Sequence, residues 1–379
     1  MIYLDYAATA PIKRDVQAAM LPFLTGEYGN ASSIYGLGRR ARSAVDTARG
    51  TIASFVGARD NELIFTSGGT ESIHSALLGA WLAQPDRKHI ITSAVEHHAV
   101  LHTCHLLEEL GVEVTVVKTD GHGQVQVADV LDAIRPDTLL VSVMMVNNEL
   151  GTVNPIQELA LRVREEHPGV LVHSDMVQAV GAFRVNIEGL GVDFASFTAH
   201  KLGGPKGIGA LYIRQGTPWK SVLRGGSQER ERRAGTENVA GIVGFAAAVE
   251  WLAQNFDLHQ GIIERRSSQL RRGLDQIPDV IFNSPTNAVS QILNLRFVGV
   301  RADRLLMRLD IEGVAASAGS ACAAGSLDPS HVLLAVGLST SAARESVRFS
   351  LSDETTEAEI EQAIVTIRDT VAWFRSRGD

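Results

Sequence analysis

The sequence predicts an α/β protein in which a large domain with a mostly parallel, mixed sheet is joined to a smaller α+β domain. From about residue 60, short runs rich in β-branched residues alternate with longer amphipathic stretches, a pattern typical of successive βαβ units. The chain has 379 residues, which exceeds the size at which a single hydrophobic core keeps growing. We therefore expect two domains, each with its own core.

Seven apolar runs in the first part of the chain are interpreted as strands, with helices between or after them. The predicted strands cover residues 62–66, 89–92, 113–117, 139–144, 170–173, 194–197 and 208–213. The predicted helices cover residues 71–82, 99–110, 156–166 and 239–255. Beyond residue 257 follow a charged helix at 264–274, strands near 291–297 and a closing helix at 357–374. We therefore place the large domain at residues 14–256 and the small domain at residues 1–13 and 257–379.

Composition and charge indicate an ordinary globular protein, which we expect in the cytoplasm. Its formal net charge of −8 argues against non-specific attraction to nucleic acid. No apolar run approaches the roughly 20 residues that cross a bilayer, and residues 1–5 lack a basic leader pattern. Two distant cysteines, Cys104 and Cys322, exclude a disulfide framework and favour a reducing compartment.

Two residues with cofactor chemistry follow neighbouring predicted strands. Asp175 lies just beyond the strand at 170–173, and Lys201 lies just beyond the strand at 194–197. Ligands of such sheets bind beyond the carboxyl ends of the strands. Pyridoxal phosphate (PLP) needs a lysine amine for a Schiff base and a carboxylate against its ring nitrogen. The pair therefore predicts a PLP site, although Asp175 also suits an Asx turn and Lys206 is a second candidate for the Schiff base.

The string Ser-Gly-Gly-Thr-Glu-Ser at residues 67–72 follows a predicted strand and opens a helix. Free N–H groups and the positive helix end would meet an anion there, so we predict Gly69 and Thr70 as phosphate ligands. A plain glycine turn with a threonine cap is the alternative. Gln178 could donate to the phenolate oxygen of the ring, and a cationic His200 would lower the pKa of Lys201.

Histidines cluster at the start of the helix predicted at 99–110. His97 follows the strand at 89–92 and could stack on a planar cofactor and act as an acid or base. His98, His102 and His105 share one helix face, as in some metal sites, but no carboxylate or second cysteine completes that face. We predict no metal.

Three further residues could act on a substrate. Cys322 lies in a stretch of small residues, 317–326, where a reactive thiol could move between substrate and acceptor, although a buried inert cysteine is the alternative. Asn148 and Arg348 follow apolar segments, and a planar guanidinium suits a substrate carboxylate, although a surface arginine is the commoner case.

Together these strings resemble the cysteine desulfurases of the NifS/IscS type, PLP enzymes with the aspartate-aminotransferase fold (PLP fold type I). The matching motifs follow the family order over nearly the whole chain, and their joint order is highly specific. They are Tyr3-Leu4-Asp5, Gly29-Asn30, Thr66-Ser67-Gly68-Gly69-Thr70-Glu71-Ser72, Glu96-His97, Val146-Asn147-Asn148-Glu149, Asp175 with Gln178, His200-Lys201, Arg233-Ala234-Gly235-Thr236-Glu237-Asn238, Ser320-Ala321-Cys322 and Arg348-Phe349-Ser350.

The resemblance implies a role for each matching residue. Lys201 would carry the Schiff base, His97 would stack on the ring and take part in catalysis, and Cys322 would be the nucleophile. The cofactor-binding residues would be Gly69, Thr70, His97, Asn148, Asp175, Gln178, Thr198, His200, Lys201 and Thr236. The substrate-binding residues would be Asn30, Asn148 and Arg348. Thr236 would reach the phosphate from the other subunit of a homodimer.

The implied reaction converts L-cysteine to L-alanine and leaves the sulfur as a persulfide on Cys322. An acceptor protein of iron–sulfur cluster assembly or of a thiolation pathway would take the sulfur, without direct contact with nucleic acid or a membrane. The stretch between Cys322 and Arg348 resembles the longer-loop NifS/IscS branch, which suits delivery to a partner. Ala31 and Tyr35 depart from the Pro and His that relatives usually carry, which leaves a contact at the cofactor edge open.

Two other functions fit the same fold. A PLP lyase or aminotransferase acting on another amino acid needs no nucleophilic cysteine, so dependence on Cys322 separates it from a desulfurase. A non-catalytic sulfur carrier or scaffold would not bind PLP and would be colourless.

Overall fold

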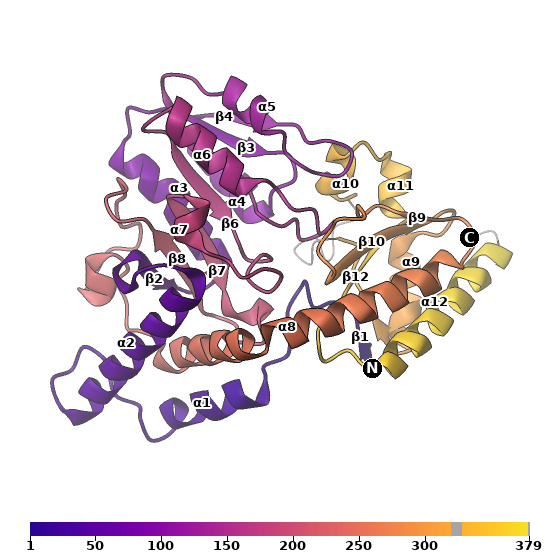
Figure 1. Ribbon diagram of the computed structural model, residues 1–379, viewed down its shortest axis with the longest axis horizontal. Coiled ribbons are helices and arrows are strands. Elements are labelled where there is room, and N and C mark those ends of the chain that lie inside the picture. Colours follow the sequence, from indigo (N-terminus) through magenta and orange to yellow (C-terminus); the bar gives the residue numbers. More distant parts are fainter. Residues whose placement is uncertain (320–327, 378–379) are drawn as a thin grey trace.

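A seven-stranded sheet forms the centre of the computed structural model, which describes residues 1–319 and 328–377 (Figure 1). The strand order is β2-β8-β7-β6-β5-β3-β4. The strands are β2 (Leu63–Thr66), β3 (His89–Ser93), β4 (Glu113–Val117), β5 (Thr138–Ser142), β6 (Leu171–Asp175), β7 (Phe194–Thr198) and β8 (Gly209–Ile213). Within this sheet β8 runs antiparallel to both of its neighbours, and the other pairs are parallel. The predicted mostly parallel, mixed sheet is confirmed.

Successive residues of the central strands point to opposite faces of the sheet, and both faces are covered. Ile90 and Leu140 pack with helices α3 (Gly69–Ala83) and α4 (His98–Glu109) in one buried cluster. Ile91 and Val141, the next residues in each strand, pack in the main cluster on the other face. That face is covered by α2 (Gly36–Val56), α5 (Val127–Asp132), α6 (Ile156–Glu166), α7 (Ile187–Leu190) and the first part of α8 (Val239–Asp275). Strands buried on both sides read as continuous apolar runs, which is why the sequence revealed them.

A second, smaller core lies around a three-stranded antiparallel sheet of order β12-β10-β9. Its strands are β9 (Val280–Phe282), β10 (Ile292–Phe297) and β12 (Ser346–Ser350). β1 (Ile2–Tyr3), at the start of the chain, pairs in parallel with β11 (Val314–Ala315) beside it. α9 (Ala302–Ile311) and α12 (Glu357–Arg377) pack on this core together with the second part of α8. The N-terminal residues therefore belong to the same core as the C-terminal ones.

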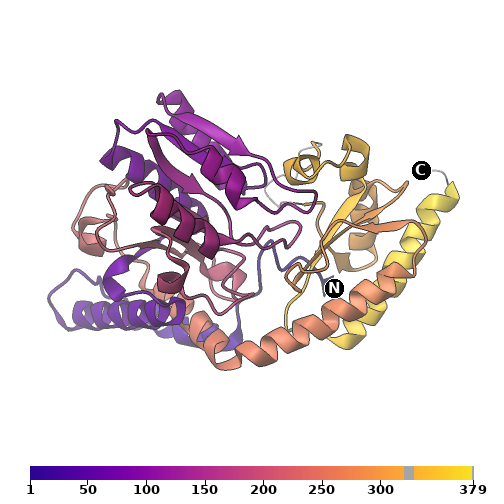
Figure 2. The same cartoon turned by 45° about the horizontal axis from the view of Figure 1, so that its top comes forward.

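The single helix α8 replaces the two helices expected at 239–255 and 264–274. It runs for 37 residues along both cores (Figure 2). No proline interrupts residues 256–263, and Phe256 and Ile263 are buried, so apolar contacts continue through the connection. By length and hydropathy α8 could cross a membrane, but 56% of that apolar window is buried inside the protein, which is what a core helix shows.

The first 60 residues contain two helices outside the predicted pattern. These are α1 (Arg14–Leu24) and α2, which pack against α8. The remaining short elements are η1 (Asp60–Glu62), η2 (Ala199–Lys201), η3 (Gln228–Glu231), α10 (His331–Ala335) and α11 (Thr340–Arg344). Between β1 and α1, residues 5–13 cross from the small core to the large one; we refer to them as the N-terminal segment.

Candidate active site

The carboxyl ends of the central strands bring the predicted cofactor residues to one edge of the sheet. Asp175 is the last residue of β6, and Thr198 is the last residue of β7. Lys201 follows Thr198 in the single turn η2, which begins as soon as β7 ends. Parallel strands place their carboxyl ends at the same edge. Asp175, Thr198 and Lys201 therefore lie at the same edge of the sheet, although Asp175 is far from the other two in the sequence.

Lys201 points to the N-terminal segment. Its Nζ donates hydrogen bonds to the carbonyl oxygens of Ala7 and Ala8, the latter at 2.7 Å. Lys206, the other candidate for the Schiff base, is exposed in the glycine loop before β8. Between the two lysines, this geometry favours Lys201.

Asp175 is a buried carboxylate with one oxygen fixed by the backbone. Its Oδ1 accepts from the N–H of Val177 at 2.9 Å. Burial raises the pKa of Asp175 to about 6, against the opposing effects of the Val177 bond and the Lys201 charge. Gln178 lies one turn further on, and its Nε2 donates to the carbonyl of Ala7 at 3.0 Å. Asp175 and Gln178 are thus held beside the atoms that hold Lys201.

His97 caps the N-terminus of α4 with its ring. Nδ1 accepts from the N–H of Ala99 at 3.1 Å, so Nε2 carries the proton in the neutral ring. Burial, followed by the charge of Lys201 and the nearby histidines, lowers the pKa of His97 to about 4. The ring is therefore neutral at physiological pH.

Glu96, which precedes His97 in the matching pair Glu96-His97, is a buried acid to which the sequence assigned no role. Its Oε1 accepts from the Ser93 hydroxyl at 2.6 Å and from the N–H of Met144 at 2.9 Å. Its Oε2 has no hydrogen-bond partner in the described part of the chain. Burial raises the pKa of Glu96 to about 8, so at neutral pH it is a protonated acid that ties the His97 turn to the end of β5.

Residues 67 and 68 form the turn between β2 and α3, and residues 69–72 open α3, where the sequence predicts an anion site. The first N–H groups of α3, at Gly69 and Thr70, point out of the helix end. A Cβ built on Gly69 would lie 2.9 Å from Val177 Cγ2, so the site accepts only glycine without a shift. Glu71 accepts the N–H of Ser67 at 2.8 Å and pairs with Arg233 at 2.8 Å.

His200 and Thr198 lie on the other side of this edge. His200 Nδ1 is 3.2 Å from the hydroxyl of Thr9, and burial, followed by the charge of Lys201, lowers the pKa of His200 to about 4. A neutral His200 does not supply the cationic neighbour that the sequence suggested for Lys201. The hydroxyl of Thr198 donates to the carbonyl of Ile208 at 3.3 Å.

Arg348 extends from β12 of the small sheet to the edge of the large one. It is buried, and its Nη1 donates to the carbonyl of Asn148 at 2.8 Å while Nη2 pairs with Asp5 at 2.7 Å. Its Nε has no hydrogen-bond partner among residues 1–319 and 328–377. Arg348 is therefore not the surface arginine that the sequence allowed. Asp5 lies in the matching string Tyr3-Leu4-Asp5 but was assigned no role, because one acid after a two-residue strand carries no local signal.

Asn30 and Thr236 lie on exposed connections, between α1 and α2 and just before α8 respectively. Asn30 Oδ1 accepts from the N–H of Ser32 at 2.8 Å. No hydrogen bond among the described residues joins Asn30 or Thr236 to the cluster around Lys201.

Cys322 lies outside the described residues. The chain on either side of it is attached to the cluster: Ser317 pairs with Arg348 through two backbone hydrogen bonds, of 2.7 and 3.2 Å, and Ser330 donates to Glu149 at 2.5 Å. Cys104 is buried, and burial raises the pKa of its thiol to about 12, so it is inert.

Three histidines on or near α4 have rings that lie close together. They are His98, His102 and His331, and the ring centroids of the last two lie 5.2 and 4.7 Å from that of His98. His331 Nε2 is engaged with the carbonyl of Glu96 at 2.9 Å. The described residues contain no group of three or more His, Cys, Asp or Glu that could hold a metal ion.

The fold and this arrangement of side chains define a member of the aminotransferase class-V family, whose model matches residues 2–363. The chain is 45% identical over 378 residues to the cysteine desulfurase IscS of Dictyoglomus turgidum, covering 99% of this chain and 95% of that protein. Among solved structures, a NifS-like protein has a TM-score of 0.93 at 34% identity, covering 98% of this chain and 99% of that one. The structure titled "SspA in complex with cysteine" has a TM-score of 0.84 at 33% identity, covering 94% and 100%. The chain therefore belongs to the cysteine desulfurases of the NifS/IscS type.

Proposed function

We propose that the protein converts L-cysteine to L-alanine with PLP as cofactor and carries the released sulfur as a persulfide on Cys322. The observation that carries this proposal is the meeting of Lys201, Asp175 and His97 at one sheet edge, with Arg348 reaching it from the small sheet. The cysteine desulfurase named above, 45% identical over nearly the full chain, supports the same reaction.

The residues at this edge fit PLP by the chemistry of their donors and acceptors. Asp175 offers a buried carboxylate for the ring nitrogen, and the helix end at Gly69 and Thr70 offers N–H groups for the phosphate. Thr198, His200 and Gln178 add polar atoms around the same space, and Asn148 lies beyond the end of β5. When bound, PLP supplies an electron sink for a carbanion formed at the substrate Cα.

Lys201 and His97 would act on the substrate. The Lys201 amine would hold the cofactor and take the Cα proton. The neutral ring of His97, with its proton on Nε2, would lie against the cofactor and offer a hydrogen bond toward the reacting atoms. Its low pKa prevents the ring from adding a positive charge beside Lys201.

Arg348 and Asn148 would hold the carboxylate of L-cysteine, with Asn30 completing the substrate site. Because Asp5 and the Asn148 carbonyl already fix two guanidinium nitrogens, the side chain is oriented before substrate arrives. A planar guanidinium held in this way binds a carboxylate with little loss of entropy.

Cys322 would attack the substrate sulfur as a thiolate. A sulfur–sulfur bond forms as the Cβ–S bond breaks, and the electron pair of that bond stays with the carbon fragment, which gains protons and leaves as L-alanine. The sum is L-cysteine plus the Cys322 thiol giving L-alanine plus the Cys322 persulfide. The outer sulfur then passes to an acceptor protein, which we propose serves iron–sulfur cluster assembly or thiolation.

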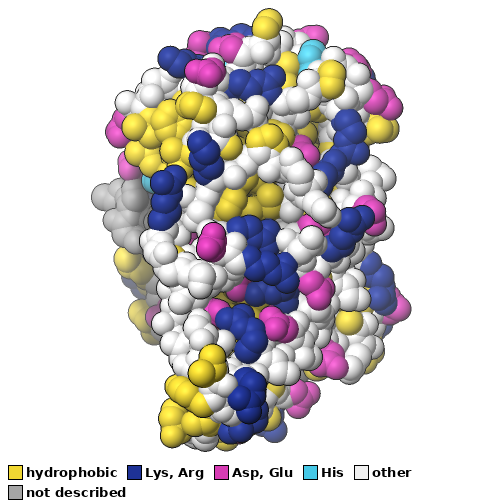
Figure 3. Space-filling view, turned by 90° about the vertical axis from the view of Figure 1, so that its left-hand side faces the viewer, with side chains coloured by type: hydrophobic (Ala, Val, Ile, Leu, Met, Phe, Trp, Pro, Cys, Tyr) yellow, Lys and Arg dark blue, Asp and Glu magenta, His cyan; other side chains and the backbone are white. Residues whose placement is uncertain are grey.

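We also propose a homodimer in which Thr236 contributes to the phosphate site of the partner subunit. Thr236 and Asn30 are exposed here, and the connection between α1 and α2 exposes Tyr28, Ile34 and Tyr35. Figure 3 shows the face formed by the left-hand side of Figure 1, where Lys and Arg side chains run down the middle with acidic ones among them, and hydrophobic side chains gather at the upper left and at the lower end. A second copy would cover these apolar side chains.

The two cores support a division into a large domain of residues 14–256 and a small domain of residues 1–13 and 257–379. Two buried clusters pack on the two faces of the seven-stranded sheet, another packs around the three-stranded sheet, and α8 contributes residues to the main cluster and to the small-sheet cluster. We propose that this two-domain enzyme works in the cytoplasm, consistent with its net charge of −8 and two cysteines.

The reaction is tested by measuring L-alanine formed from L-cysteine by PLP-loaded protein with a reducing thiol present. Wild type should form alanine and, after a single turnover without thiol, gain one sulfur atom on Cys322 by mass spectrometry. Cys322→Ala should keep the cofactor absorption and lose both signals. Equal turnover by Cys322→Ala would indicate a lyase instead.

The lysine assignment is tested separately by cofactor retention. After removal of unbound PLP, Lys201→Ala should lose the absorption of lysine-linked cofactor, whereas Lys206→Ala, at an exposed position, should keep it. The reverse result would move the assignment to Lys206.

A further inference from the structure

The N-terminal segment, residues 5–13, lies along the turn that carries Lys201. The Ala10 N–H donates to the carbonyl of His200, and the Lys13 N–H donates to the carbonyl of Gly203, both at 2.9 Å. The carbonyls of Ala7 and Ala8 accept from the Lys201 amine itself. The N-terminal segment therefore binds the Lys201 turn through backbone hydrogen bonds and through the Lys201 side chain.

The same segment is fastened to the end of β12, the strand that carries Arg348. The N–H of Ala7 donates to the hydroxyl of Ser350 at 2.8 Å, and the N–H of Ser350 donates to the carbonyl of Leu4 at 2.8 Å. Asp5 pairs with Arg348. One short stretch thus touches both the lysine and the arginine of the proposed site.

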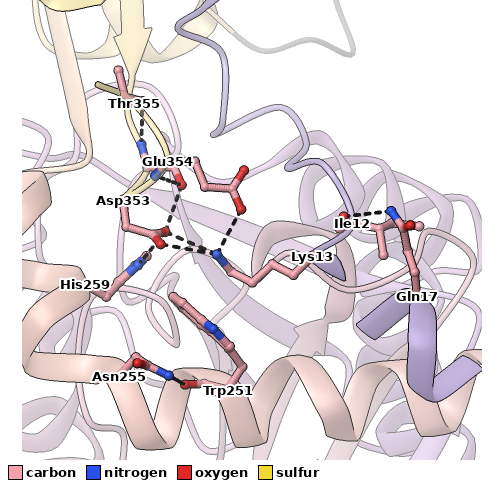
Figure 4. A network of polar contacts seen from close by, with 10 residues as sticks. Ile12, Lys13, Gln17, Trp251, Asn255, His259, Asp353, Glu354 and Thr355 are labelled. Atoms are coloured by element: carbon pink, nitrogen blue, oxygen red, sulfur yellow. Dashed lines mark hydrogen bonds and ion pairs between the residues drawn. The ribbon is translucent and has the colours of Figure 1, made fainter. Parts of the chain in front are cut away.

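A cluster of charged and aromatic side chains fixes the far end of the segment (Figure 4). Lys13 Nζ lies 3.6 Å from the centroid of the Trp251 ring and 3.3 Å from Asp353. Asp353 also accepts from His259 Nδ1 at 2.8 Å. Glu354 is the second partner of Lys13, at 3.2 Å, but its side chain is 43% exposed, against 13% for Asp353.

The partners in this cluster come from three parts of the chain. Lys13 precedes α1, Trp251 and His259 lie on α8, and Asp353 follows β12. Burial alone would raise the pKa of Asp353, but the His259 hydrogen bond and the Lys13 charge lower it to about 2. Asp353 therefore stays ionised at physiological pH, and the cluster joins the two cores beside the Lys201 turn. These residues also line one cavity, together with Gln178 and Lys201.

We propose that the Ala7 and Ala8 carbonyls form the acceptor site for the Lys201 ammonium after it has taken the substrate proton, and that Lys13 and Asp353 are the positioning residues that keep this acceptor site in place. This inference rests on the proposed function, because it assigns Lys201 as the cofactor lysine. Carbonyl oxygens bind an ammonium better than a neutral amine. They therefore favour proton uptake by Lys201 and keep its charge near the substrate.

Backbone carbonyls cannot be removed by substitution, so the test changes the residues that position them. Lys13→Met and Asp353→Asn remove one side of the buried pair, and Lys13→Arg keeps the charge and the contact with Trp251. Glu354→Gln is the matched control, because it removes a partner of the same lysine at an exposed site, where ion pairs contribute little.

The first measurement is amide hydrogen exchange at Ala10 and Lys13, in protein with and without PLP. Exchange should accelerate about tenfold or more in Lys13→Met and Asp353→Asn, as expected for loss of a charge-assisted interaction. Lys13→Arg and Glu354→Gln should stay near wild type. Unchanged exchange in both test variants would overturn the positioning role.

The second measurement separates the lysine step from substrate binding. In PLP-loaded Lys13→Met and Asp353→Asn, kcat for alanine formation should fall about tenfold while KM for L-cysteine changes little, because Arg348 keeps Asp5 and Asn148. The pKa read from the cofactor absorption should also shift relative to Glu354→Gln, which a purely structural role would not produce. A rise in KM alone would overturn the proposal, whereas wild type that binds no PLP would refute the proposed function instead.

Discussion

A buried ion pair binds one of the two edge strands of the central sheet, β2. Breaking that pair should open the segment that precedes Thr236, a residue of the proposed dimer contact. The Leu63 carbonyl of β2 accepts from Arg49 at 3.0 Å, and the Phe65 N–H donates to Glu229 at 2.9 Å. Arg49 and Glu229 join each other by two bonds, of 2.6 and 2.8 Å, with both side chains 6% exposed or less.

Glu229→Gln keeps the shape of the side chain and removes its charge, leaving Arg49 buried without a counter-charge. Breaking a buried pair in this way costs about 3–5 kcal/mol, and we take the low end because glutamine keeps one acceptor. At 1.36 kcal/mol per factor of ten, about 3 kcal/mol corresponds to roughly 150-fold faster opening. Glu229, Arg230 and Glu231 all have positive φ, between 50° and 64°, a backbone conformation that is strained in non-glycine residues and favours rearrangement once the pair is broken.

The assay is hydrogen exchange at the Phe65 amide, whose acceptor is the substituted side chain. Exchange should rise by about the factor above in Glu229→Gln, while Glu231→Gln, two residues on and exposed, should leave it unchanged. The double variant Arg49→Met/Glu229→Gln should lose less opening free energy than the sum of the losses in the two single variants, because neither charge is then buried without its partner. Additive costs, or equal exchange in Glu229→Gln and Glu231→Gln, would refute the reasoning.

Three further predictions concern the site. Because burial raises the pKa of Glu96 from 4.5 to about 8, its contribution to stability is present below pH 4.5 and is lost as the pH rises through 8. In Glu96→Gln, the free energy of unfolding should decline less over this pH range than in wild type. An equal decline in both proteins would contradict the assignment. Arg348→Met should lower kcat/KM for L-cysteine about 100-fold, from loss of roughly 3 kcal/mol of charged hydrogen bonding, mainly through KM; unaltered KM would place the carboxylate elsewhere. His97→Phe should retain PLP by absorption but form alanine more slowly, and full activity would limit the ring to stacking.

The sequence predicted the large sheet well because its strands are buried on both faces and therefore read as apolar runs. Strand ends fell within two residues of their observed positions, for example 139–144 against Thr138–Ser142 for β5. The helices α1 and α2 were missed because they pack on α8 rather than following the βαβ alternation. The break expected within α8 was wrong because residues 256–263 keep apolar contacts with the core.

The candidate site was predictable where one residue follows one strand, as for Asp175 and Lys201. It was not predictable where the partner lies far away in the chain. Asp5 meets Arg348 across 343 residues, and Lys13 meets Asp353 across 340. No local spacing records such contacts, since they arise only when both cores have formed. The roles of the site residues, Lys201 and Asp175 as much as Cys322 and Thr236, stay predictions.

The first residues of the chain pair with residues near its end, so their folding must follow the synthesis of nearly the whole chain. β1 pairs with β11, and the acceptors of the Lys201 amine are fixed by Ser350 and Asp353. At translation rates of about 5–20 residues per second, the ribosome needs roughly 20–70 s to reach residue 353. During that time the first dozen residues wait without their strand partner, although every strand of the large sheet has been made once synthesis passes residue 213. A nascent chain therefore contains Asp175 and Lys201 before it contains Ser350 and Asp353, the residues that fix the N-terminal segment against Lys201.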